Sequence, residues 1–453
     1  MRIVIVGLGK VGKNLTKMLS ESGYDIVAVD SDPATVEEVT NLDDVLALCG
    51  NGASLEIQRE AGVPESDMLI ACTSNDEVNI LCCLTAKKIG IRHTIARVRK
   101  PEYAEHVRLL REELGLSLAI NPEKAVAREI ARILRFPNAT KVESFSKRRL
   151  DFVEYRIEAG SKLDGSRLDG IYAKFRVRVL ICAVLRNKEC IIPSGDFVLQ
   201  ADDVIYVAAS AKEMERFFDT ACGVKQSVRN VMIAGASRIA RYLTEELSEA
   251  GIAVRVVDLD EERCREFSET VPKALVIFGD ATDSELLQEE DLAQMDAFVA
   301  LTGLDETNIL LSLYAKGQQV KKTIAKVNRP GFTEFVADSR LVDTVVSTGP
   351  VVAEMIARYI RAMQSSRGGG VAALHHVADG KAEALEFRVS AGCSFAGVPF
   401  KELRLKKNLL IGGIVRQSGN VIIPGGNDAL QPGDDVIVVT TDKTLTDLEQ
   451  ILA

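Results

Sequence analysis

Short apolar runs alternate with amphipathic segments along the first 140 residues of the chain. Each run is short enough to be a buried strand, and the segments between the runs have the period of helices. The expected strands are residues 2–7, 25–30, 45–49, 68–73, 93–98 and 117–120. Strands that alternate with helices form a parallel sheet with helices on both faces. The pattern therefore predicts an α/β fold with a doubly wound, Rossmann-like parallel sheet.

The same pattern occurs a second time. Residues 2–30 and 230–258 each contain an apolar strand, a turn of small residues, an amphipathic helix and a second strand that ends in Asp. The correspondence continues downstream, because CGNGASLEIQ at 49–58 aligns with FGDATDSELL at 278–287. Self-similarity over this length indicates a duplication. We expect two Rossmann-like domains in one polypeptide.

After each of these units the sequence pattern changes to short strand-like runs separated by turns. The two stretches match one another through IIPSGDFVLQADDVIYV and IIPGGNDALQPGDDVIVV, which predicts a small α+β domain after each Rossmann-like domain. Residues 368–370 are three glycines, expected to form a flexible joint before the last domain. The most economical architecture is a duplicated two-domain cassette, with domains at 1–140, 141–225, 226–366 and 367–453.

Composition narrows the class of protein. The 453 residues are 47% hydrophobic and 27% charged, as in a soluble globular protein. The formal charge of −9 argues against a general nucleic-acid binder, which needs a basic face. No apolar run is long enough to span a membrane, and the apolar start leads directly into a glycine turn, unlike a signal peptide. From that start we expect a cytoplasmic protein, and nine scattered cysteines without a C-x-x-C pair fit reduced buried thiols better than a disulfide framework or a zinc site.

A glycine-rich turn lies between the first strand and the first helix, at Gly7, Leu8, Gly9, Lys10, Val11 and Gly12. In this G-x-G-x-x-G pattern the first glycine makes the tight turn and the second lets the backbone approach a pyrophosphate. The third lets helix and strand pack closely. The helix N-terminus then presents unpaired N–H groups to the phosphates. We expect a nucleotide to bind at this turn.

Asp30 ends the second strand, where an acidic side chain accepts hydrogen bonds from a ribose diol. It would repel a 2′-phosphate, and the neighbouring Ser31 and Asp32 supply no compensating cation. These residues favour NAD(H) over NADP(H). ATP or ADP is the alternative, because an adenine nucleotide uses the same ribose and phosphate features.

The rest of the cleft is expected beyond the carboxyl ends of the other strands, where ligands of such sheets bind. That position nominates six further contacts, namely Asn51, Gly52, Thr73, Ser74, Asn75 and Arg97. For Ser74 and Asn75 there is an alternative role, as the cap of the helix that begins near Asp76.

The second copy departs from the pattern. It retains Gly235 and Asp258, but Ser237 replaces the central glycine and Ala240 the last one. A serine side chain crowds the approach of a phosphate, whereas Arg238 and Arg241 could partly offset this with their charge. The second copy is therefore either a weaker or differently selective nucleotide site or a degenerate unit retained for packing.

Residues for catalysis are scarce. A dehydrogenase needs a proton donor or acceptor beside the nicotinamide. The four histidines are expected to be surface or structural residues, with His93 at the start of a strand, His106 in a helix and His375-His376 in a solvated segment after the glycine joint. No P-loop lysine is present to support ATP hydrolysis. We expect no enzyme, with an NAD-dependent oxidoreductase of unidentified substrate as the alternative.

Together, the glycine turn with Asp30, CGNGAS, ACTSNDEVN, the P-S-G-D…DDV-I segment and the duplicated cassette resemble the TrkA family over essentially the whole chain. Members of this family are cytosolic nucleotide-binding subunits of Trk-type potassium uptake systems, built from two RCK (regulator of K⁺ conductance) units. The resemblance implies a peripheral protein on the inner face of the cell membrane, assembled as a homo-oligomeric ring, with a tetramer expected. It would bind NAD(H), or ATP and ADP, and control a separate potassium channel membrane subunit.

Such control would act by population shift. A nucleotide that binds one arrangement of the ring more tightly than another biases the ring by that difference in affinity. A soluble redox- or nucleotide-responsive scaffold without a channel is a third interpretation of the same residues.

Overall fold

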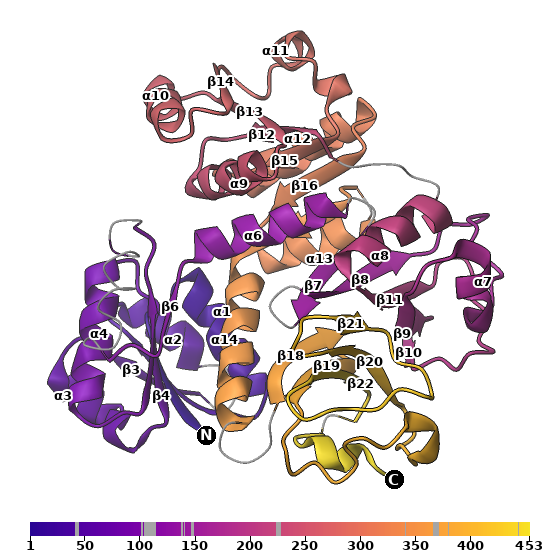
Figure 1. The fold of residues 1–453 in the computed structure, drawn as a ribbon. Helices are drawn as coiled ribbons and strands as arrows, with labels where there is room; N and C mark the ends of the chain where they lie inside the picture. Colours follow the sequence, from indigo (N-terminus) through magenta and orange to yellow (C-terminus); the bar gives the residue numbers. More distant parts are fainter. Residues whose placement is uncertain are drawn as a thin grey trace. The chain divides into compact units, whose positions relative to one another are not determined.

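A computed structural model shows four β-sheets in series along the chain (Figure 1). It describes residues 1–40, 45–100, 103, 115–136, 139, 141–145, 149–222, 228–339, 341–365, 371–378, 380–442 and 444–453. The glycine joint at 368–370 and His106 lie outside the described residues. The chain forms two compact units, one of residues 1–131 and 230–357 and the other of residues 132–229 and 358–453.

The first sheet is fully parallel, in the order β3-β2-β1-β4-β5-β6. Its strands are β1 (Arg2–Val6), β2 (Asp25–Asp30), β3 (Val45–Cys49), β4 (Met68–Ala71), β5 (His93–Arg97) and β6 (Leu118–Ile120). The six predicted strands are confirmed, and their ends differ from the prediction by at most two residues. The helices around it are α1 (Lys10–Glu21), α2 (Pro33–Thr40), α3 (Leu55–Glu60), α4 (Asp76–Lys88) and α6 (Pro122–Arg135).

The third sheet along the chain repeats the first, in the order β14-β13-β12-β15-β16-β17. Its strands are β12 (Asn230–Ala234), β13 (Ala253–Asp258), β14 (Leu275–Phe278), β15 (Ala297–Ala300), β16 (Lys322–Lys326) and β17 (Thr344–Val346). Its helices are α9 (Arg238–Glu249), α10 (Glu261–Thr270), α11 (Ser284–Glu289), α12 (Asp305–Gly317), α13 (Pro330–Ser339) and α14 (Thr348–Ser365). The duplication of the Rossmann-like fold is confirmed.

Two five-stranded antiparallel sheets make up the smaller domains, in the orders β10-β9-β11-β8-β7 and β18-β19-β22-β20-β21. The first contains β7 (Lys141–Phe145), β8 (Leu150–Arg156), β9 (Leu180–Arg186), β10 (Glu189–Ile191) and β11 (Val204–Ala209), with the helices α7 (Ile171–Phe175) and α8 (Ala211–Phe217). The second contains β18 (Val371–Val377), β19 (Ala382–Arg388), β20 (Leu409–Val415), β21 (Val421–Ile422) and β22 (Asp435–Thr440).

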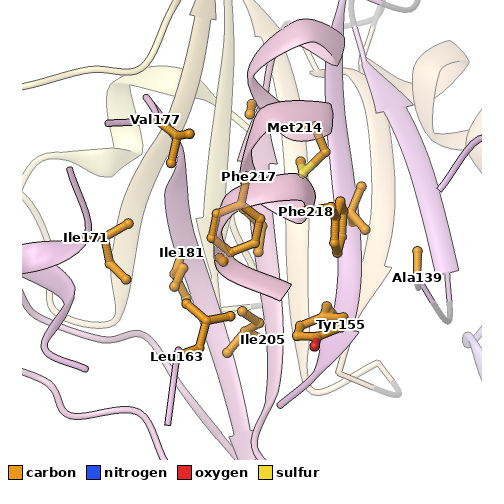
Figure 2. Close-up of a cluster of buried hydrophobic side chains, with 14 of the residues drawn as sticks. Ala139, Tyr155, Leu163, Ile171, Val177, Ile181, Ile205, Met214, Phe217 and Phe218 are labelled. Carbon is orange, nitrogen blue, oxygen red and sulfur yellow. The ribbon is translucent and has the colours of Figure 1, made fainter. Parts of the chain in front are cut away.

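An aromatic cluster holds α8 against the sheet of the first small domain (Figure 2). Phe217 and Phe218 lie with their ring centroids 5.6 Å apart, and Phe218 meets Tyr155 of β8 edge to face at 5.5 Å. Met214 and Phe217 are fully buried. Burial of large apolar side chains stabilises the domain, and edge-to-face pairs add to this beyond their area.

The two small domains share a core within their compact unit. Phe145, Phe152 and Cys182 of the first domain belong to the same buried cluster as Ala384 and Val439 of the second. Because each sheet covers apolar surface of the other, the two small domains form one packed body.

The prediction of a solvated segment at His375 is wrong. The residue lies in β18 and is 3% exposed. Its Nδ1 is 2.8 Å from an Oε2 of Glu143, and its ring centroid is 4.3 Å from that of Phe145. The error has a physical reason, because pairing of His375 with Ala384 of β19 places this position on the buried face of the sheet.

Helix α6 of the first copy contacts α9 of the second within the unit that holds both parallel sheets. Asn121, next to the start of α6, donates from Nδ2 to the Tyr242 hydroxyl at 3.1 Å. Further along α6, Arg128 pairs with Glu246 at 3.0 Å. Polar contacts therefore join the two Rossmann-like domains through α6.

We predict that the stability of the second Rossmann-like domain depends on pH because of the buried Lys322. The pKa of this amine is lowered from 10.5 to about 8, chiefly by burial; the Asp343 carboxylate opposes the shift and the Lys316 ammonium contributes to it. Between pH 8 and 10.5 the unfolded amine holds a proton that the folded one has lost. Stability should therefore rise with pH across that window.

Lys322→Met should accordingly stabilise this domain at pH 7, by about 3 kcal/mol for a shift of this size, and flatten its pH profile. Asp343 would keep Lys316 as a partner at 2.8 Å. Thermal melting of both proteins from pH 7 to 10.5 measures the effect, and a flat profile in the parent protein would contradict it.

Candidate nucleotide site

The three glycines of the first turn meet different surroundings. Gly7 has a φ of 91°, and a Cβ on it would lie 2.6 Å from the backbone nitrogen of Thr73. A Cβ on Gly12 would lie 1.9 Å from the carbonyl oxygen of Gly7. A Cβ on Gly9 would meet nothing within 4 Å. The fold thus requires the first and third glycines, whereas the open space at Gly9 suits the close approach of a ligand.

Helix α1 begins directly after Gly9, which provides no side-chain cap. The N–H groups of the first turn, from Lys10 to Gly12, lack carbonyl partners inside the helix by its geometry. The Leu8 and Val11 side chains are buried, so these two residues contribute packing. Any ligand contact of Leu8 or Val11 would come from the backbone.

The Asp30 carboxylate, at the end of β2, lies against the turn. Its Oδ2 accepts from the backbone N–H of Leu8 at 2.6 Å, and its Oδ1 accepts from that of Asp32 at 3.0 Å. In the part of the chain that the structure describes, no side chain donates to this carboxylate. Each oxygen therefore keeps acceptor capacity, which fits the two hydroxyls of a ribose diol.

The other candidates of the first copy divide into structural residues and open ones. Asn75 caps α4, because its side chain accepts from the Val78 N–H at 2.9 Å, so the capping alternative holds for this residue. Asn51 accepts from Ala53 N–H at 3.0 Å. A Cβ on Gly52 would lie 2.2 Å from Val6, which makes this glycine necessary for packing.

Arg97 and Ser74 are tied to nearby backbone. The Nη1 of Arg97 donates to the Cys72 carbonyl at 3.4 Å, while its buried Nε has no hydrogen-bond partner among the described residues. Burial lowers the pKa of Arg97, and the neighbouring Arg99 lowers it further. Arg99 donates to the Ser74 carbonyl. Arg97 therefore keeps one unused N–H donor among the described residues.

Asn79 is a residue of the candidate site that the sequence interpretation did not nominate. Its Oδ1 accepts from the N–H and the hydroxyl of Thr73 at 2.8 and 2.7 Å, and its Nδ2 donates to the Arg97 carbonyl at 3.0 Å. Asn308 makes the same bonds to Thr302 and Lys326 in the second copy. This side chain joins the ends of two strands that border the cleft. The identity of Asn79 and Asn308 at aligned positions was the available signal.

The second copy places its residues around a cavity of about 760 Å³. The lining includes Gly235, Ser237, Arg238, Arg241, Asp258, Arg263 and Lys326. The serine hydroxyl caps α9, because its Oγ accepts from the Ala240 N–H at 3.3 Å. A helix N–H that a phosphate could bind is thus engaged by the protein itself.

Cations of the second site have protein partners. Arg238 lies 4.0 Å from Glu123 of α6, and Arg241 lies 3.2 Å from Glu245. Lys326 donates to the Thr302 carbonyl at 2.7 Å. Burial lowers the pKa of Lys326. A phosphate entering this cavity would have to compete with these partners.

The contrast between Gly9 and Ser237 predicts how the two sites differ. Gly9→Ser should fold normally, because the position is open, yet weaken NADH at the first site toward the affinity of the second. Ser237→Gly should strengthen dinucleotide binding at the second site. Calorimetry of both variants measures these changes, and equal NADH affinities of the two sites in the parent protein would contradict the steric argument.

Comparison with known proteins identifies the family. The family model described as the TrkA-N domain matches residues 3–122 and 231–348, and the TrkA-C domain matches residues 152–221 and 384–453. A Trk system potassium uptake protein TrkA homolog of Archaeoglobus fulgidus is 31% identical over 453 residues, which is 100% of both chains. The Trk system potassium uptake protein TrkA of Halomonas elongata is 30% identical, over 100% of this chain and 98% of its own.

A solved structure confirms the fold. The structure described as the GsuK channel bound to NAD superposes with a TM-score of 0.63 at 18% identity, over 98% of this chain and 77% of that one. Both family models match twice, and the relatives are similar from end to end. The chain therefore belongs to the TrkA family, with a TrkA-N and a TrkA-C domain that each occur twice.

Proposed function

We propose that this protein is the cytosolic, nucleotide-sensing regulatory subunit of a Trk-type potassium uptake channel. The observation that carries the proposal is the first glycine turn, where Asp30 keeps acceptor capacity beside an open Gly9 at the carboxyl ends of parallel strands. NAD(H) is the proposed ligand at this site, and ATP or ADP is the second candidate. The relatives named for potassium uptake and the structure named for bound NAD support the proposal.

The site offers binding groups in place of acid–base chemistry. His93 begins β5 and so lies at the opposite end of that strand from the cleft. His375 pairs with Glu143 in the other compact unit. Burial raises the pKa of Cys72, below the turn, to about 12, so this thiol stays protonated near neutral pH and is a poor nucleophile. These surroundings favour a sensor over an oxidoreductase.

The proposed role implies a binding partner and a location in the cell for this protein. In the part of the chain that the structure describes, no helix is long and apolar enough to cross a membrane. The proposal places the protein on the inner face of the cell membrane, held there by a separate channel subunit. It includes a homo-oligomeric ring, with a tetramer expected, and a shift between ring states on nucleotide binding. The domain limits near residues 140, 226 and 367 belong to the same proposal.

Two measurements test this function. The purified protein should leave NADH unconsumed in the presence of common oxidisable and reducible substrates. It should also co-purify with a Trk-type potassium channel subunit when both are expressed together. Substrate-dependent NADH turnover that disappears with Asp30→Ala would favour the oxidoreductase instead.

A further inference from the structure

The aspartates that end β2 and β13, Asp30 and Asp258, differ in their hydrogen-bond partners. Asp258 repeats the backbone contacts of Asp30, since its Oδ2 accepts from the Ala236 N–H at 2.6 Å and its Oδ1 from the Asp260 N–H at 3.0 Å. The guanidinium of Arg263 is added in the second copy only. Its Nη1 lies 3.4 and 3.3 Å from the Oδ1 and Oδ2 of Asp258.

These contacts use up the acceptor capacity of Asp258. A carboxylate has about four lone-pair positions, and two backbone N–H groups with a bifurcated guanidinium occupy them. Asp258 is 5% exposed, so water cannot readily compete for them. A plain ribose diol would therefore have to displace Arg263, whereas at Asp30 the same diol finds oxygens that each accept one backbone N–H and can accept another hydrogen bond.

Arg263 itself is still able to bind a ligand. Its side chain is 53% exposed and lines the cavity. Its Nη2 lies 3.2 Å from Asp260, which leaves N–H donors of the guanidinium directed elsewhere. Asp280 also lines the cavity, but its Oδ1 is engaged by the N–H and hydroxyl of Thr282, both at 2.8 Å.

We propose that Arg263 determines the specificity of the second site, and makes it select a nucleotide with a phosphate group on its ribose. The inference rests on the proposed nucleotide-sensing function. Arginine beside the ribose position is the feature that accommodates a 2′-phosphate in this fold, and it forms strong bidentate bonds with phosphate. Because the Arg263 guanidinium partly offsets the charge of Asp258, the repulsion that Asp30 exerts in the first site is reduced. One chain would then bind two nucleotides that differ in phosphorylation, one at each site.

The chain offers a matched exchange to test this assignment. Thr35 occupies the position of Arg263 in the first copy, five residues after the aspartate in both. Arg263→Thr should lower NADPH affinity at least tenfold and create a second NADH site per chain. Thr35→Arg should lower NADH affinity at the first site and allow NADPH to bind there. Thr35 donates to Asp32 at 2.7 Å, so Thr35→Ala is the control that loses this bond without adding a cation.

Calorimetry of the full chain with NADH and NADPH distinguishes the outcomes. The proposal is supported if NADPH binding survives Asp30→Ala and is lost in Arg263→Thr. It is overturned if Arg263→Thr changes neither NADPH affinity nor the number of NADH sites, while Asp30→Ala still weakens NADH; the sensing function would then stand without it. A parent protein that binds neither nucleotide would overturn both.

Discussion

Asp30→Ala should weaken NADH binding roughly ten- to a hundredfold. The carboxylate is placed to accept hydrogen bonds from the ribose, and a loss of charged hydrogen bonding of about 1.5–3 kcal/mol in total corresponds to this factor. The same variant also releases the Leu8 N–H, which now donates to Asp30 at 2.6 Å. Asp30→Asn separates these effects, because an amide oxygen can still accept from Leu8 while the charge is lost.

Asp32→Ala is the matched control for this experiment. It removes a neighbouring carboxylate whose contacts are local, with the Thr35 hydroxyl and the Ala34 N–H. NADH affinity should change little in this variant. Calorimetry measures the NADH affinity of each variant. If folded Asp30→Ala binds NADH as tightly as the parent protein, or if the first site binds NADPH as tightly as NADH, the proposed role of Asp30 is wrong.

Gly7→Ala should destabilise the first Rossmann-like domain by about 3 kcal/mol or more and abolish nucleotide binding at the first site. The left-handed backbone at this position strains any residue with a side chain by about 1–2 kcal/mol. A Cβ would also meet Thr73 backbone atoms at 2.6 and 2.7 Å, which cannot yield as the end of a side chain can.

Gly9→Ala is the control, because the same added methyl group meets open space. Its melting temperature should match that of the parent protein while its nucleotide affinity falls. Parallel thermal melts and NADH titrations give both quantities. If Gly7→Ala melts like the parent protein, the turn is able to relax and the strain argument is wrong.

The fold was largely predictable because duplication doubled the evidence for each element. Strand β1 is buried along Ile3, Val4, Ile5 and Val6, and such continuous apolar runs are diagnostic of a central parallel strand. The wrong prediction for His375 shows what local sequence could not predict. Whether a histidine in a short strand faces solvent or the core depends on register, which is set here by β19 and cannot be read from local sequence.

The candidate site could be nominated from the sequence where a backbone motif defines it, and less readily where side chains far apart in the sequence meet. The turn and Asp30 come together as the motif implies. Arg263 was missed because it lies in a helix after the strand, where an arginine beside acidic residues is typical of a solvated face. Asn79 was missed because a polar residue inside α4 has no motif, although it binds backbone of two neighbouring strand ends.

Potassium flux through the reconstituted complex of this protein with a Trk-type channel subunit tests the central claim most directly. An effector shifts a gate only as far as its affinities for the two states differ. Flux should therefore change when NADH is added to the parent protein, and Asp30→Ala should blunt that response in proportion to the lost coupling. The same NADH response with parent protein, with Asp30→Ala and with the channel subunit alone would contradict the account.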